Sequence, residues 1–117
     1  VNTINNMRND FVSTGIGKSE TVPFVLSTCT TDATYSPNAA VVNSGLLSIM
    51  DDAAPTHVVV LDNTDLARDD QAGQFVHYTA DARRIFARRM VSALQNAQAD
   101  VRGRAAFTDA KNTAVAN

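Results

Sequence analysis

The chain has little or none of several residue types that mark particular classes of protein. Of 117 residues only Cys29 is a cysteine, which excludes a disulfide within the chain and is typical of the reducing cytoplasm. Tryptophan is absent, aromatic residues make up 6%, and apolar runs such as 58–61 are far shorter than the roughly 20 residues of a membrane span. We therefore expect a cytoplasmic protein that makes no membrane contact.

Motifs for common cofactors and metals are also missing. The sequence has neither the GxGxxG pattern of dinucleotide-binding folds nor the GxxxxGK pattern of phosphate-binding loops. No HxxxH or CxxC spacing surrounds His57 or His77, and the acids from Asp62 to Asp65 lack the alternation and closing glutamate of a calcium loop. The sequence predicts no metal site, and it identifies no catalytic residue.

Glutamate and lysine are rare, so the charged surface is built from aspartate and arginine. Glu20 is the only glutamate among 12 acids, and Lys18 and Lys111 are the only lysines among 10 bases. Guanidinium groups bind carboxylates and phosphates through two nitrogens at once, so this composition suits an anionic partner, although biased codon usage would produce it as well. The net charge of -2 and the 44% hydrophobic content are those of an ordinary globular chain.

Length and periodicity predict one domain over residues 1–117 with frayed last residues. In the clearest helix, Phe86, Met90 and Leu94 form an apolar stripe, which puts Arg84, Arg88 and Arg89 on the outer face. The expected elements are a helix at 3–12, strands at 24–30, 57–62, 74–78 and 100–109, and a helix at 80–97.

Residues 39–50 decide the architecture and fit two patterns. Val42 and Leu46 would share one face of a helix, whereas Val41 and Val42 with Gly45 fit a strand with a bulge. We expect the strand, and with it an α+β fold in which a compact antiparallel sheet or split barrel packs on the 80–97 helix, with a short N-terminal helix. A helix at 39–50 would instead give a layered α/β sandwich.

Three stretches of sequence resemble one known family. They are VLSTC at 25–29 with SPN at 36–38 and AVVNSG at 40–45, then VVVLDNT at 58–64 with Arg68, and VRGRAAF at 101–107. Together they are similar to the pyridoxamine phosphate oxidase-like family of FMN-binding split β-barrels. The resemblance implies an FMN-binding protein or a small flavin-dependent oxidoreductase. We expect it to act as a homodimer, because a short sheet leaves its edges open.

The resemblance also implies which residues bind the cofactor. Asn43 and Ser44 would meet the flavin ring or ribityl chain, and Asn63, Thr64 and Arg68 would hold the phosphate. A phosphate dianion needs a guanidinium and hydroxyl donors, which one loop would then supply. The other interpretation of the Asn63–Thr64 pair is a turn that ends a strand.

A non-enzymatic function is the alternative, because no catalytic pattern is present. A homodimeric assembly protein, for example a virion component, would use its strand edges and a helix face as the interface. The densest positive region would contact nucleic acid or an acidic partner, and comprises Arg84, Arg88, Arg89, Arg102 and Arg104. Nucleic acid is the less favoured of these partners, because the net charge is negative and no aromatic residues are interleaved for base stacking.

Overall fold

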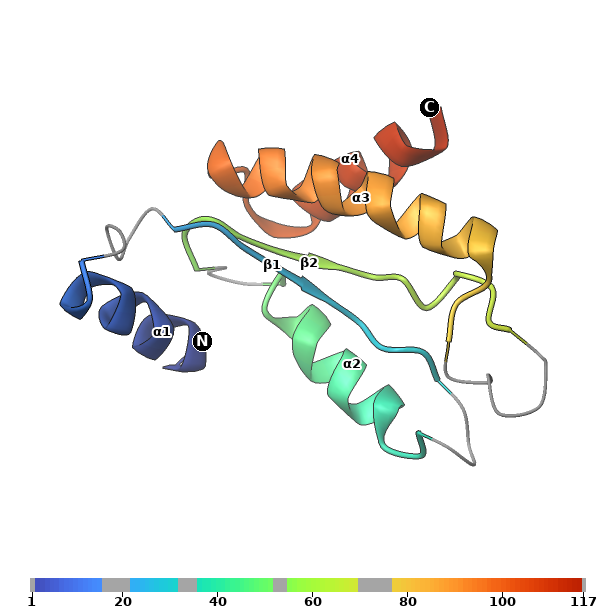
Figure 1. Cartoon of the computed structure of the whole chain (residues 1–117), viewed down its shortest axis with the longest axis horizontal. Coiled ribbons are helices and arrows are strands. Elements are labelled where there is room, and N and C mark those ends of the chain that lie inside the picture. The colour runs from blue at the N-terminus through green and yellow to red at the C-terminus, as the bar shows by residue number, and fades with distance from the viewer. Residues whose placement is uncertain (1, 16–21, 32–35, 52–54, 70–76, 117) are drawn as a thin grey trace.

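A computed structural model of the chain describes residues 2–15, 22–31, 36–51, 55–69 and 77–116. Within these ranges the fold is α+β, as predicted, with four helices and a two-stranded sheet (Figure 1). The elements in chain order are α1 (Asn2–Ser13), β1 (Phe24–Ser27), α2 (Ala39–Ser48), β2 (Val58–Leu61), α3 (Ala80–Gln98) and α4 (Gly103–Ala116). None of the helices within the described ranges is long and apolar enough to cross a membrane.

The sheet is parallel and open, so the predicted antiparallel sheet or split barrel is wrong. Phe24 of β1 is in register with Val58 of β2, and Ser27 with Leu61. Parallel strands cannot be joined by a tight hairpin and need a crossover connection, usually a helix. Here α2 is that connection, so the strand expected at 39–50 is a helix.

The helices cover both faces of the sheet. Figure 1 shows α2 on one side of the two strands and α3 with α4 on the other, while α1 lies beside the start of β1. All four residues of β2 are buried, whereas those of β1 are only partly buried. This arrangement corresponds to the layered alternative and makes β2 the centre of the core.

Small side chains bring α3 and α4 close to β2. Ala93 and Ala97 of α3 and Ala106 and Ala110 of α4 are fully buried in one cluster with β2. These alanines lie four residues apart, on one face of each helix. The strand predicted at 100–109 is therefore wrong, because the residues from Gly103 onward belong to a helix, in which Ala106 and Ala110 are buried while Ala105 is exposed.

The buried face of α3 is rotated relative to the predicted stripe. Helix 80–97 itself is confirmed, and Thr79 caps it by accepting a hydrogen bond from the N–H of Ala82. Leu94, however, is exposed, and Arg89 is buried although the helical wheel had placed it outside. The alanine contact with β2 and α4 determines the rotation, and larger apolar side chains are left outside.

The turn between α3 and α4 places the start of α4 beside the start of β2. Asp100 and Gly103 both have positive φ, at 56° and 70°. The carboxylate of Asp100 accepts a hydrogen bond of 2.8 Å from the N–H of His57, and the ring Nδ1 of His57 lies 2.8 Å from the carbonyl oxygen of Ala97. Hydrogen bonds from Arg102 and from His57 lower the pKa of Asp100 to about 2.

The N-terminal helix is confirmed, and one arginine attaches it to the sheet. The guanidinium of Arg8 donates hydrogen bonds to the carbonyl oxygens of Val22 and Thr56, and it lies 5.3 Å from the ring centre of Phe24. Burial lowers the pKa of this guanidinium. Most of the strand predicted at 74–78 lies outside the described residues; Tyr78 forms a single antiparallel bridge with Arg68.

Candidate functional site

The segments that follow the two strands meet at one edge of the sheet, because parallel strands end on the same side. In open α/β sheets, ligands bind in the crevice outside this carboxyl edge. Thr31 lies beyond the end of β1, and Thr64 lies beyond the end of β2. Both side chains line one groove.

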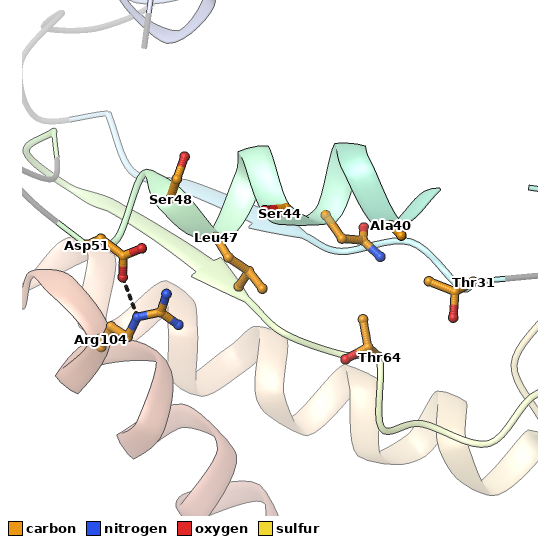
Figure 2. Close-up of a pocket in the computed structure, with 9 residues that line it drawn as sticks. Thr31, Ala40, Ser44, Leu47, Ser48, Asp51, Thr64 and Arg104 are labelled. Carbon is orange, nitrogen blue, oxygen red and sulfur yellow. Dashed lines mark hydrogen bonds and ion pairs between the residues drawn. The ribbon is translucent and has the colours of Figure 1, made fainter. Parts of the chain in front are cut away.

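The groove follows α2 and has a volume of about 410 Å³. Figure 2 shows Asp51 and Arg104 at one end, Thr31 at the other, and Thr64 opposite the helix. Its lining residues are Thr31, Ala40, Asn43, Ser44, Leu47, Ser48, Asp51, Thr64 and Arg104. Five of these nine residues have a hydroxyl or amide side chain, one is a cation and one is an anion.

The charged end of the groove is an exposed ion pair between Arg104 and Asp51. Each side chain keeps about half of its surface in contact with solvent. The hydrogen bond from Arg104 lowers the pKa of Asp51, and Asp51 in turn raises that of Arg104. Since exposed pairs contribute little to stability, Arg104 can exchange this partner for another anion at small cost.

Asn43 connects α2 to the end of β1. Its amide oxygen accepts a hydrogen bond of 2.8 Å from the N–H of Cys29, and its amide nitrogen donates one of 2.9 Å to the carbonyl oxygen of the same residue. The Asn43 side chain thus makes the two backbone hydrogen bonds with Cys29 that a neighbouring strand would otherwise make. We call this contact the Asn43 bridge; it holds the wall of the groove against the sheet.

Asn63 makes a larger set of contacts at the end of β2 and is fully buried. Its backbone N–H donates to the hydroxyl of Thr28, and its side-chain nitrogen donates to the hydroxyl of Ser27 at 2.9 Å. Its side-chain oxygen accepts a hydrogen bond of 2.9 Å from Arg89. The residue is satisfied on all sides within the protein and joins β1, the loop after β2, and α3.

Arg89 extends this network to Asp65. Both terminal nitrogens of the guanidinium donate to the Asp65 carboxylate at 2.8 Å, and Lys111 of α4 lies 3.4 Å from the same carboxylate. The Arg89 hydrogen bonds lower the pKa of Asp65 to about 2. We call the group of Asn63, Asp65 and Arg89 the Arg89 clamp.

The residues expected to bind FMN separate into three groups. Asn43, Ser44 and Thr64 line the groove together. Asn63 precedes Thr64 in the chain but is not among the described lining residues, and its side chain binds Arg89 in the Arg89 clamp. Arg68 is not among the described residues that line the groove, and its backbone bridges to Tyr78.

The guanidinium that the groove does contain is Arg104, which sequence analysis had placed only in the alternative basic region. The strand assumed at 100–109 concealed this, since in a strand Arg104 would face solvent with Arg102. Glycine at position 103, just before a run of good helix formers, was the available signal.

The five arginines of the alternative basic region do not form one free positive surface. Arg89 is 3% exposed and binds Asp65. Three of the others bind acids, in the pairs Arg84–Asp81, Arg102–Asp100 and Arg104–Asp51. Arg88 is exposed on α3. Most of the positive charge is therefore neutralised locally.

Within the described ranges, no three His, Cys, Asp or Glu side chains gather in a way that could hold a metal ion. Cys29 is a free thiol and is exposed at the end of β1. Neither a family model, nor a curated protein, nor a solved structure matches this chain.

Proposed function

We propose that the chain binds a mononucleotide in the groove along α2, with FMN as the ligand that the sequence favours. The observation that carries the proposal is the groove itself, because it joins the carboxyl edge of a parallel sheet to a guanidinium along a row of hydroxyl groups. Its volume of about 410 Å³ lies within the usual range for small-molecule sites.

The groove chemistry suits the sugar and phosphate of such a ligand. Ser44 and Thr31 offer hydroxyl groups for a ribityl chain or ribose, whereas the hydroxyl of Ser48 donates to the carbonyl oxygen of Gly45. The hydroxyl of Thr64 donates to Asp62, so it would accept a hydrogen bond from the ligand. Arg104 would bind the phosphate, in place of the Arg68 expected from sequence.

The fit to the flavin ring is weaker than the fit to the ribityl phosphate. The apolar groups in the described lining are Ala40 and Leu47, with no aromatic ring among them, so ring contacts would be aliphatic. Bound FMN would supply electron or hydride transfer, while the chain would bind and orient it. Oxidoreductase activity therefore depends on FMN binding first.

Fluorescence titration with FMN and with riboflavin, and competition of a purine mononucleotide against bound FMN, test the proposal. FMN should bind, riboflavin should bind more weakly because it lacks the phosphate, and a purine mononucleotide shows whether the site selects the base or only the sugar phosphate. Arg104→Ala should weaken FMN binding by about tenfold, as expected for the loss of one charged hydrogen bond worth about 1.5 kcal/mol. Arg68→Ala is the matched control and should leave the affinity unchanged. No binding of any of the three ligands, or equal loss in both variants, would contradict the proposal.

A homodimeric assembly protein is the second candidate, and the outer surface of α2 favours it. Val41 is 75% exposed and Val42 50%, and α2 contains no charged residue. Such a surface suits contact with a second copy of the chain. Sedimentation should show a dimer at micromolar concentration that Val41→Asp converts to a monomer; a monomeric wild-type chain would remove this candidate.

A further inference from the structure

The Arg89 clamp lies directly behind the groove, and its contacts bracket a groove residue. Asn63 and Asp65 are the two neighbours of Thr64 in the chain, and the same guanidinium binds both of them. The side chain of Thr64 lines the groove, while its two neighbours bind α3. The position of Thr64 is thus set by a residue that does not line the groove.

We propose that Arg89 is a positioning residue for the groove, which fixes the loop after β2 so that Thr64 faces α2. The expected effect on ligand binding rests on the proposed function, whereas the expected effect on the loop does not. The guanidinium of Arg89 donates from two nitrogens to both carboxylate oxygens of Asp65 and also to the amide oxygen of Asn63, whereas the single nitrogen of a lysine cannot make this bidentate contact. Binding Asn63 and Asp65 in this way therefore requires arginine at position 89.

The cost of burying Arg89 supports a role beyond simple stability. Its side chain is almost inaccessible, and its Nε atom has no hydrogen-bond partner among the described residues. Burying a charge costs free energy that an ion pair rarely returns in full, and apolar replacements are often as stable. What the clamp provides is one fixed loop conformation, held from β1, α3 and α4 together.

Asp65 allows the clamp to be broken without a cavity in the core. Its side chain is about half exposed, so Asp65→Ala leaves no buried void, while it removes both carboxylate hydrogen bonds to Arg89. Arg89→Lys keeps the charge but cannot reach both partners. The two variants disrupt the same loop from opposite sides.

Two measurements on these variants test the inference. The first is amide hydrogen exchange at Asn63 and Leu66, whose N–H groups bind Thr28 and Asn63 within the protein. We expect exchange at both sites to be about tenfold faster in Arg89→Lys and in Asp65→Ala, while β2 amides keep their protection. Arg88→Lys, on the exposed side of the same helix, is the control and should exchange like wild type.

The second measurement is FMN affinity, at a temperature where circular dichroism shows every variant folded. Both clamp variants should lose about tenfold in affinity, the lower end of what is lost when a residue that orients a binding group is removed. If wild type binds no FMN, the proposed function fails, and the exchange experiment still decides the positioning role. Unchanged exchange at Asn63 and Leu66 in both clamp variants would overturn it, as would faster exchange spread evenly over the whole chain.

Discussion

An asparagine side chain binds the end of each strand, but the two asparagines differ in their surroundings. At the end of β1, Asn43 binds the backbone of Cys29 with two hydrogen bonds; the Asn43 side chain is buried, while Cys29 itself is exposed. At the end of β2, Asn63 is fully buried and takes part in a network that reaches three other elements. The β1 side is therefore a local contact beside solvent, whereas the β2 side is a rigid part of the core.

This difference teaches where the groove is stiff and where it can adjust. The α2 wall is held to the sheet by the two hydrogen bonds of Asn43 and by Leu46 and Leu47, which pack against the core, while its outer surface is exposed. The opposite wall, at Thr64, is held by the Arg89 clamp. We expect a ligand to move α2 rather than the loop after β2.

The largest expected effect contrasts the two strands themselves. Leu61→Ala in β2 should lower the free energy of unfolding by about 2–5 kcal/mol, because it leaves a cavity in a site with no exposure. Leu26→Ala in β1, which is partly buried, should cost about 1–2 kcal/mol. Urea denaturation gives both values, and equal costs would show that the strands do not differ.

Next in size is the contrast between the two asparagines. Asn63→Ala should cost about 1–3 kcal/mol, because Ser27 and Arg89 lose a buried partner. Asn43→Ala should cost less, about 1 kcal/mol, because it removes the partner of two backbone groups of Cys29, an exposed residue, rather than the partner of a buried guanidinium. A larger loss for Asn43 would reverse the comparison, and the same denaturation experiment measures it.

The pH dependence of stability provides a smaller and more specific test. The folded pKa of Asp65 is about 2, below the roughly 3.9 of an unfolded aspartate, so its ion pair stabilises the protein above pH 4. That contribution should disappear as pH falls from about 4 to about 2. Asp65→Asn should flatten this part of the profile, and an unchanged acid limb in the variant would mean that Asp100 or other acids dominate it.

The smallest effect on the free energy of unfolding is expected on the outer face of α3, and it is the reference for the other variants. Arg84 pairs with Asp81, and both side chains are mostly exposed. Arg84→Ala should change the free energy of unfolding by less than about 0.5 kcal/mol. If thermal denaturation shows a loss comparable to that of Asn63→Ala, surface charges contribute more than this comparison assumes.

Patterns with a strong local cause were predictable from sequence. The helices at 3–12 and 80–97 and the buried strand at 57–62 all follow from periodicity or from an unbroken apolar run. Asn43, Ser44 and Thr64, which the family resemblance indicated as FMN contacts, lie together in the groove, and their part in binding stays a prediction. These elements depend little on contacts between distant parts of the chain.

The errors arose where distant contacts decide the structure. Residues 39–50 fit a helix or a strand locally, and only the parallel pairing of β1 with β2 requires the helix. Ala106 and Ala110 are too small for their spacing to indicate a buried helix face in the sequence, yet they form the face of α4 that meets α3. Arg89 looks like a surface residue until Asn63 and Asp65 are seen to surround it.

The parallel pairing of the strands also determines the order in which the chain can fold. β1 ends at Ser27 and β2 begins at Val58, so their alignment must close a long loop, whereas α3 and α4 are joined by a short turn. We expect the helical hairpin to become protected early in refolding and β1 to join last, as pulse-labelling would record. A groove bounded by α2 would then be the last part of the molecule to take shape.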